Sequence, residues 1–266
     1  MIRPLTLCAA LLLPCAAAGQ TTPAAEAPRK ITPYKIILVG DSTTAVVGGW
    51  GPSFCALHVT SFAACVNLAR GGRSSGNYRS EGSWDVALSE MRTSGYRTTW
   101  VLIQFGHNDQ PGKPGRSTDL ATEFPANLAR YVDEVRAAGA VPVLVTPLTR
   151  RSFKDGKLQN DLEPWAEATR RIAARKGVAL ADLNARSVAA VQAMGEEAAD
   201  RFAQLPKGSA PTGQERITEV QEQPMARAKL SFDRTHLGRE GADYFAAMMT
   251  TELARAVPEM RHLLIP

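Results

Sequence analysis

The sequence has few cysteines, few aromatic residues and little sign of a metal site. It contains 4 cysteines in 266 residues, and aromatic residues make up 6%. Neither an H-E-x-x-H pattern nor a C-x-x-C pair is present, so a zinc site has little support. The apolar run near the N-terminus is too short to span a bilayer, and no other segment is a transmembrane candidate.

A recognisable nucleic-acid-binding module is also lacking, so we expect no nucleic-acid partner. The formal net charge of +5 permits an acidic partner without requiring one. Hydrophobic residues make up 44% of the chain, and its length is sufficient for one or two domains with a full core. General disorder and collagen-like repetition are therefore excluded.

The start of the chain has the layout of a secretory signal peptide: a charged start, a short apolar stretch and small residues at a cleavage site. We expect a signal peptide at 1–19, a flexible leader at 20–33 and one domain at 34–266. The protein would then be exported and be periplasmic or extracellular. A lipoprotein signal ending at Cys15 is a minor alternative, because Pro14 stands where a small residue is required.

Cys55 and Cys65 are the two cysteines that remain after the expected signal peptide. A lone pair in an exported chain most simply forms one disulfide, and two buried thiols are the alternative. We therefore expect these two cysteines to be bonded to each other.

Apolar runs of strand length alternate with helical patterns along the chain. Their apolar residues are continuous rather than alternating, which is typical of strands buried on both faces of a parallel sheet. We expect strands at 36–39, 66–69, 100–105, 141–146 and 178–183 and helices at 125–138, 162–176, 184–204 and 240–257. Residues 206–232 are expected to form a loop, and the sequence does not show whether this loop covers the site. This alternation predicts a doubly wound α/β fold in a single domain.

Polar blocks follow the ends of the expected strands, where ligands bind in open α/β sheets. They are G-D-S-T at 40–43, G-G-R-S at 71–74 and G-H-N-D at 106–109, and D-R-T-H at 233–236 precedes the last helix. Each block alone also has a structural interpretation, as a helix cap or a self-satisfied loop. Together they supply the nucleophile, base, orienting carboxylate and oxyanion donors that acyl transfer requires.

These four blocks, in this order, resemble those of the SGNH (GDSL-type) hydrolase superfamily. The G-W-G at 49–51 and the full blocks narrow the resemblance to rhamnogalacturonan acetylesterases, which remove acetyl groups from the pectin backbone. The resemblance extends over nearly the whole chain after the signal peptide. It implies a flavodoxin-like three-layer α/β/α sandwich with a five-stranded parallel sheet, and an enzyme that needs no metal or organic cofactor.

Carried over to this sequence, the resemblance implies a mechanism. Ser42 would be the nucleophile, His236 the base that takes its proton, and Asp233 the carboxylate that holds the imidazole. The backbone N–H groups of Ser42 and Gly72 and the side-chain amide of Asn108 would bind the oxyanion. Water would then release acetate from the acyl-enzyme.

Four further residues are candidates for substrate binding. Arg73 and Arg79, with Arg70 beside them, suit bidentate recognition of galacturonate carboxylates, or else belong to a solvated loop. Trp50 either stacks on a sugar ring or packs its own loop. His107 is a candidate for substrate contact or a rival base, with a structural role as the alternative.

A competing nucleophile is present in the second block. Residues 72–76 fit the G-x-S-x-G elbow of α/β-hydrolases, with Ser74 at the centre. That motif requires a helix directly afterwards, whereas residues 77–83 indicate a loop, and no Gly-rich oxyanion motif is visible. The sequence therefore favours Ser42 over Ser74.

The function expected from the sequence is that of an exported serine esterase that deacetylates an acidic plant polysaccharide, above all rhamnogalacturonan, and acts as a monomer. The alternatives are the same chemistry on acetylated xylan, lipids or thioesters, and a non-catalytic carbohydrate-binding protein on the same fold. Arg, Ser, Asn and Gly in the loops beside the blocks favour a sugar over a lipid. The complete Ser, His, Asp and Asn set argues against a binding protein, a choice that the fold alone does not decide.

Overall fold

The structure is a computed structural model of the whole chain, and it describes residues 31–210 and 230–266. The expected signal peptide at 1–19, most of the leader at 20–33 and most of the loop at 206–232 lie outside the described residues. Among the helices of the described ranges, none is both long enough and apolar enough to cross a membrane.

Five parallel strands form the central sheet, in the order β2-β1-β3-β4-β7. Counted along the chain this is the order 2-1-3-4-5 of flavodoxin-like folds. The strands are β1 (Tyr34–Gly40), β2 (Ala63–Asn67), β3 (Thr99–Gln104), β4 (Val141–Val145) and β7 (Ala179–Ala181). The middle strands are buried on both faces, as their continuous Val, Leu and Ile runs predict, which confirms the α/β fold with a five-stranded parallel sheet.

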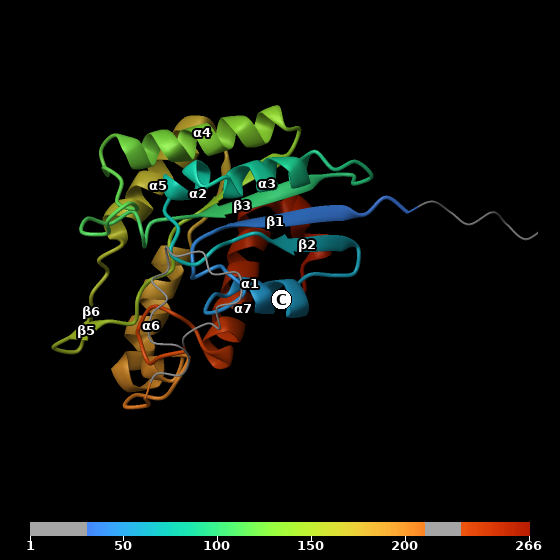
Figure 1. Cartoon of the computed structure of the whole chain (residues 1–266). Helices are drawn as coiled ribbons and strands as arrows, with labels where there is room; N and C mark the ends of the chain where they lie inside the picture. The colour runs from blue at the N-terminus through green and yellow to red at the C-terminus, as the bar shows by residue number, and fades with distance from the viewer. Residues whose placement is uncertain (1–30, 211–229) are drawn as a thin grey trace, which may run out of the picture. The chain divides into compact units, whose positions relative to one another are not determined.

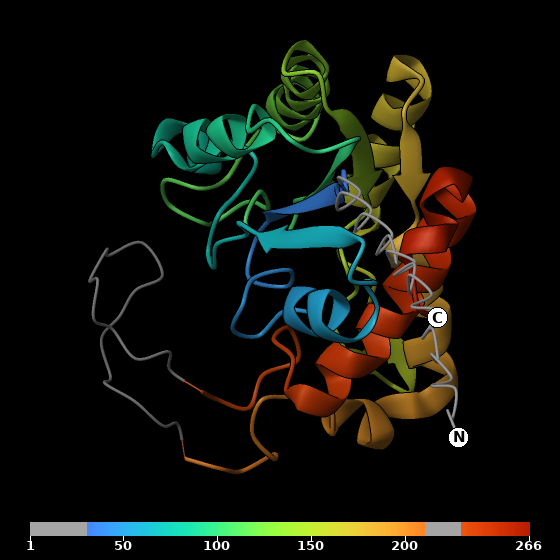
Figure 2. The same cartoon turned by 90° about the vertical axis from the view of Figure 1, so that its right-hand side faces the viewer.

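Helices cover both faces of this sheet (Figure 1). One face carries α2 (Asn77–Ser80), α3 (Ser83–Met91), α4 (Glu123–Ala137) and α5 (Glu163–Lys176), and the other carries α1 (Gly51–Leu57), α6 (Leu183–Asp200), α7 (Arg239–Ala256) and the 3₁₀ helix η1 (Pro258–Leu263). Figure 2 shows α1 lying beside α7. Because successive strand residues point to opposite faces, Ile36 and Leu38 belong to one apolar cluster and Ile37 and Val39 to the other.

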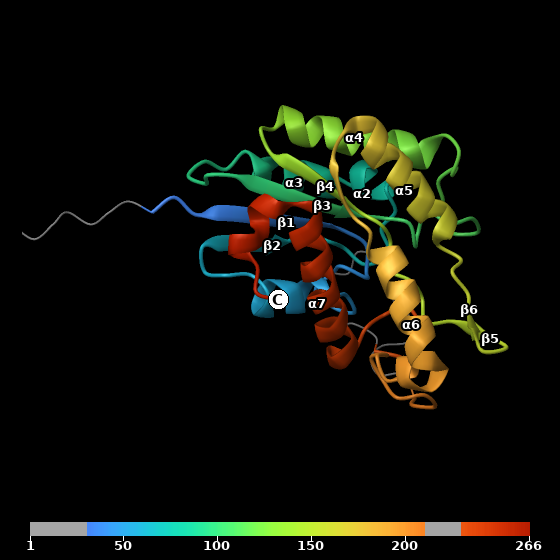
Figure 3. The same cartoon turned by 180° about the vertical axis from the view of Figure 1, so that it is seen from behind.

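Several elements differ from the sequence expectation. α2 lies in a segment that was expected to be a loop, and α3 was not expected. β2 begins three residues early, because its register on β1 pairs Ala63 with Tyr34. The helix expected to run to residue 204 ends at Asp200 and is interrupted at Gly195, whose φ of +78° no α-helix contains. A short hairpin of β5 (Phe153–Lys154) and β6 (Lys157–Leu158) was not expected, and it lies beside α6 (Figure 3).

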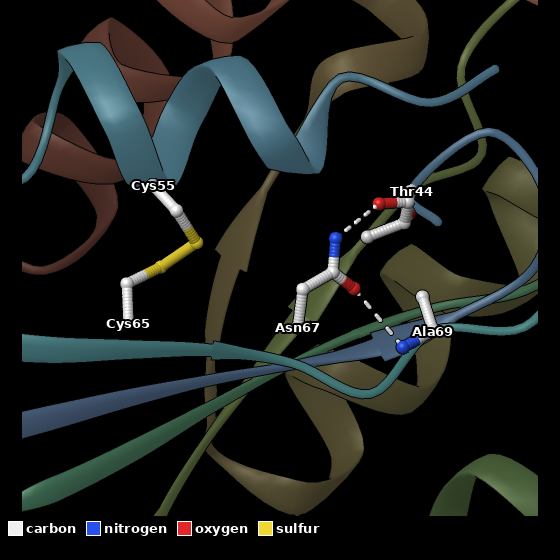
Figure 4. Close-up of a disulfide and its surroundings, with 5 residues drawn as sticks. All are labelled: Thr44, Cys55, Cys65, Asn67 and Ala69. Carbon is white, nitrogen blue, oxygen red and sulfur yellow. Dashed lines mark hydrogen bonds between the residues drawn. A yellow bond between two sulfur atoms is a disulfide. The ribbon is translucent and has the colours of Figure 1, made fainter. Parts of the chain in front are cut away.

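A disulfide joins Cys55 on α1 to Cys65 on the edge strand β2, as the sequence predicts (Figure 4). Two residues further along, the side-chain amide of Asn67 donates to the carbonyl oxygen of Thr44 at 2.8 Å and accepts from the N–H of Ala69 at 3.0 Å. The disulfide and this amide therefore fix the segment after β1 to the neighbouring strand.

Replacing Cys55 and Cys65 together by serine should lower the free energy of unfolding by about 2–3 kcal/mol, because the bond constrains a short loop in the unfolded chain. The two cysteines are 10 residues apart in sequence. Denaturant unfolding of wild type and the double variant measures the difference. A reductant should bring the wild type down to the variant and leave the variant unchanged. Equal midpoints without reductant would contradict the expectation.

Candidate active site

Three side chains form a continuous hydrogen-bonded chain at the carboxyl edge of the sheet. Ser42 lies in the turn after β1, whereas Asp233 and His236 lie in the loop before α7. Oγ of Ser42 is 2.9 Å from Nε2 of His236, and Nδ1 of His236 is 2.9 Å from Oδ2 of Asp233. An imidazole with its proton on Nδ1 accepts the serine proton at Nε2, so this arrangement is competent for acyl transfer.

Asp233 is held as a carboxylate by its own loop. Its Oδ1 accepts the backbone N–H groups of Thr235 at 2.7 Å and His236 at 2.6 Å. Burial raises the pKa of Asp233, but the hydrogen bonds and charge of His236 and the two backbone N–H groups outweigh burial and lower it to about 2. The group that faces the imidazole is therefore charged at any ordinary pH.

Asp41 shapes the turn that carries Ser42. Its Oδ1 accepts the backbone N–H of Thr43 at 2.9 Å and the hydroxyl of Thr43 at 2.7 Å. Gly40, just before it, has no room for a side chain, since a Cβ there would lie 2.7 Å from the carbonyl oxygen of Gln104 on β3. β1 and β3 thus approach each other closely at Gly40, directly before the turn that carries Ser42.

His107 lies behind this turn. Its side chain is buried, and its Nδ1 is 3.3 Å from Oδ2 of Asp41. Burial lowers the pKa of His107, against the opposing effect of Asp41. Burial raises the pKa of Asp41, but His107 and Thr43 together bring it below its usual value. The expectation that His107 contacts substrate is therefore wrong, because the ring is the buried partner of Asp41.

Gly72 and Asn108, the expected oxyanion donors, come from two loops that contact each other. Gly72 has a φ of +75°, a conformation that favours glycine. The Nδ2 of Asn108 donates to the carbonyl oxygen of Arg73 at 3.1 Å, and its Oδ1 accepts from Nη1 of Arg116 at 3.3 Å. These contacts fix the orientation of the amide, in which one of the two hydrogens on Nδ2 is donated to Arg73. The oxyanion role itself stays a prediction.

A buried carboxylate ties the same two loops together. Oδ1 of Asp109 accepts the backbone N–H of Ser75 at 3.0 Å, the hydroxyl of Ser75 at 2.6 Å and the hydroxyl of Thr118 at 2.8 Å. Burial raises the pKa of Asp109 to about 6 despite these hydrogen bonds. The carboxylate of Asp109 therefore ties the loop that follows residues 71–74 to the loop of residues 106–109.

Ser42 and His236 line a pocket of about 440 Å³. One wall is apolar and is formed by residues 45–47, of which the two valines are exposed. Arg70 and Arg73 are the two cationic residues in the lining of the pocket. The other described residues in its lining are Ala69, Gly71 and Gln204.

Two of the expected substrate-binding side chains lie elsewhere, so these expectations are wrong. Trp50 is fully buried and donates its Nε1–H to Oε1 of Gln104 at 3.0 Å, which leaves no ring face for a sugar. Nη2 of Arg79 donates to both carboxylate oxygens of Glu134 on α4, at 2.8 and 2.9 Å, and the guanidinium lies 4.9 Å from the ring centre of Tyr131. Both side chains hold elements together.

Ser74, the competing nucleophile, is also buried. The segment after it is not the loop that the sequence indicated, because α2 begins at Asn77. The hydroxyl of Ser74 nevertheless donates to Oδ1 of Asn77 at 3.0 Å and accepts its backbone N–H at 3.2 Å. These contacts occupy the hydroxyl at the start of a helix, and Ser74 is not among the residues that line the pocket.

Sequence reasoning missed Arg116, which contacts the amide of Asn108, and Arg151, which lies beneath the loop of Asp233 and His236. Neither belongs to a recognisable block, so the sequence offers no signal for them. In the part of the chain that the structure describes, no group of three or more His, Cys, Asp or Glu side chains is placed to hold a metal ion.

The fold and the site together define a carboxylic ester hydrolase built on a parallel α/β sheet. Residues 38–244 match the GDSL-like Lipase/Acylhydrolase family, and the chain belongs to this family.

Two Bacillus subtilis (strain 168) proteins are similar in sequence. Probable rhamnogalacturonan acetylesterase YesY is 33% identical over 180 residues, which cover 65% of this chain and 81% of that protein. Rhamnogalacturonan acetylesterase RhgT is 34% identical over 178 residues, 64% of this chain and 73% of that protein. The crystal structure of YXIM_BACsu from Bacillus subtilis is similar in fold, with a TM-score of 0.62 and 22% identity, over 85% of this chain and 57% of that longer one.

Proposed function

We propose that this protein is an exported serine esterase that removes O-acetyl groups from an acidic plant cell-wall polysaccharide, above all rhamnogalacturonan. The observation that carries the proposal is the Ser42–His236–Asp233 chain in a pocket that is also lined by Arg70 and Arg73. The two similar Bacillus subtilis proteins, both named for rhamnogalacturonan, support the same substrate. Export rests on the sequence of residues 1–19 and is tested by the N-terminus of the secreted protein, expected at residue 19 or 20.

The proposed reaction proceeds through an acetyl-enzyme. Nε2 of His236 takes the hydroxyl proton of Ser42 as Oγ attacks the ester carbonyl. The oxyanion is bound by the N–H groups of Ser42 and Gly72 and by the amide of Asn108. The protonated imidazole then gives its proton to the departing sugar oxygen. Water, deprotonated by the same imidazole, then attacks the acetyl carbonyl. The imidazolium returns this proton to Oγ of Ser42 as the bond to the acetyl group breaks, which releases acetate.

An acidic polymer fits the charge of the pocket. Arg73 forms a close pair with Glu81 through Nε, at 3.0 and 2.9 Å, and Arg70 lies 3.7 Å from the same carboxylate. Both guanidinium groups thus lie beside the carboxylate of Glu81, and both arginines line the pocket. The side chain of Arg70 is 43% exposed, and its Nη1 donates to the hydroxyl of Ser83 at 3.0 Å, which holds it in place. A uronate carboxylate is a group that arginine side chains recognise, whereas a neutral xylan carries no such group.

Replacing Arg70 by glutamine should lower kcat/KM for acetylated rhamnogalacturonan about tenfold relative to acetylated xylan, because a hydrogen bond to a charged group is worth roughly 1.5–3 kcal/mol and 1.4 kcal/mol is a factor of ten. Acetate release from the two polymers measures this ratio. Arg171→Gln is the matched control, since that arginine lies on the surface of α5, and it should leave the ratio unchanged.

Other outcomes decide between the remaining functions. A wild-type preference for acetylated xylan, with no effect of Arg70→Gln on the ratio, would assign the site to a neutral polymer. A preference for long-chain aryl esters would assign it to lipids. Tight binding of the polysaccharide without acetate release, under conditions where the protein is folded, would make it a binding protein.

A further inference from the structure

Arg151 is a fully buried cation beneath the loop that carries Asp233 and His236. It lies in the segment between β4 and β5, which no sequence block marks. Burial lowers the pKa of Arg151 to about 10, against the opposing effect of nearby Asp233 and Asp200, so the guanidinium remains charged at neutral pH. Burying a charge is costly unless its hydrogen bonds are satisfied, and the partners of this one are therefore informative.

The partners of Arg151 are backbone carbonyl groups of one short loop. Nη2 donates to the carbonyl oxygens of Asp233 at 3.0 Å and His236 at 2.8 Å, and Nη1 donates to that of Thr235 at 3.3 Å. The backbone N–H of Arg151 donates to the carbonyl oxygen of Arg234 at 2.8 Å. All four carbonyl groups from 233 to 236 thus bond to this single residue.

The opposite ends of two of these peptide groups point at the catalytic carboxylate. The carbonyl of Thr235 shares its peptide group with the N–H of His236, and that of Arg234 shares its group with the N–H of Thr235. Both N–H groups donate to Oδ1 of Asp233. Since the two ends of a trans peptide point in opposite directions, both dipoles run from Arg151 to Asp233, with their positive ends on the carboxylate. The negative end of the Thr235–His236 peptide lies on the guanidinium, and that of the Arg234–Thr235 peptide lies on the backbone N–H of Arg151.

We propose that Arg151 is a positioning residue for the hydrolytic reaction, one that acts through these peptide groups. By holding their carbonyl ends, Arg151 keeps both N–H groups on Oδ1 of Asp233, so that Oδ2 is left for Nδ1 of His236. The inference rests on the proposed role of Ser42, His236 and Asp233 but not on the identity of the polysaccharide.

A second arginine in the same loop provides the comparison. Arg234 points away from the site and bonds to Asp200 at 2.9 and 3.0 Å and to Glu196 on α6. It anchors the outer side of the loop by side-chain contacts alone. Loss of Arg234 should lower stability without reorienting the peptide groups that face Asp233, whereas loss of Arg151 should affect both.

The test compares Arg151→Met, Arg151→Lys and Arg234→Gln, in the full-length protein and well below the unfolding temperature of each variant. With p-nitrophenyl acetate as substrate, Arg151→Met should lower kcat about 10- to 100-fold with less than a twofold change in KM, because a small displacement of a catalytic group has an effect of this size. Arg151→Lys, which keeps a charge and reaches some of the carbonyl groups, should recover part of the loss. Arg234→Gln should change kcat less than twofold.

A spectroscopic measurement separates positioning from stability. In wild type and in Arg234→Gln, the Nδ1–H proton of His236 should give a far-downfield NMR resonance, and Arg151→Met should shift it upfield or broaden it. Unchanged kcat and an unchanged resonance in folded Arg151→Met, or in Arg151→Lys if the methionine variant does not fold, would overturn the inference. Failure of the polysaccharide assay alone would overturn the proposed substrate and leave this result standing.

Discussion

Ser42→Ala should lower the rate of acetate release by about 10⁶-fold, the loss that follows removal of a serine nucleophile in a triad. The physical reason is that Oγ of Ser42, 2.9 Å from Nε2 of His236, is the only atom of the chain that we propose to bond covalently to the acetyl group. The measurement is the initial rate on acetylated rhamnogalacturonan and on p-nitrophenyl acetate. A fluorophosphonate probe should add its mass to wild type and not to Ser42→Ala.

Ser74→Ala is the matched control for this prediction. Its hydroxyl is buried and bonds only to Asn77 in the contacts that the structure gives, so the variant should keep its activity and lose about 1 kcal/mol of stability. The opposite pattern, with activity kept in Ser42→Ala and lost in Ser74→Ala, would show that Ser74 is the nucleophile and Ser42 is not.

Asp233→Asn should lower kcat by about 10⁴-fold with little change in the structure, as replacing the carboxylate of a triad by an amide does. Oδ1 of Asp233 accepts two backbone N–H groups, so the carbonyl oxygen of an asparagine would take that position. Its NH₂ group would then face Nδ1 of His236 and require Nδ1 to accept. The imidazole proton would move to Nε2, where the ring no longer accepts the proton of Ser42.

Asp133→Asn is the control for the carboxylate change. Asp133 on α4 pairs with Lys176 on α5, and neither residue lines the pocket. This substitution should leave kcat unchanged. Equal activity of Asp233→Asn and wild type, together with an unchanged circular dichroism spectrum, would show that Asp233 does not set the tautomer.

The strands in the middle of the sheet could be predicted closely from the sequence, whereas the edge strands β2 and β7 were predicted with inexact bounds. Continuous Val, Ile and Leu runs identify β1, β3 and β4, because a strand buried on both faces requires them. The edge strand β2 begins with Ala63 and Ala64, which have little strand propensity, and its position is set by pairing with β1. The hairpin at 153–158 did leave a signal, Asp155-Gly156, whose positive φ angles suit a tight turn.

In the candidate site, likewise, some residues could be predicted from the sequence and others could not. The blocks located Ser42, Asp233 and His236, which the fold brings within hydrogen-bonding distance. The substrate-binding expectations failed for Trp50 and Arg79 because their partners, 54 and 55 residues away in sequence, are fixed only by packing. A pattern of residue types therefore identifies which groups react, whereas contacts between distant segments decide which side chains face the solvent.

The hydrogen bond between Ser42 and His236 joins residues 194 positions apart, at opposite ends of the folded chain. A chain that has not yet been made or folded beyond α6 has the serine and the oxyanion loops but no base. On the proposed mechanism, catalytic competence therefore requires the loop before α7 to dock on the turn after β1. Contacts of such long sequence range form slowly, because the loop they close is entropically costly. Ester hydrolysis during refolding would thus report completion of the native topology, and it should lag behind the recovery of helical signal.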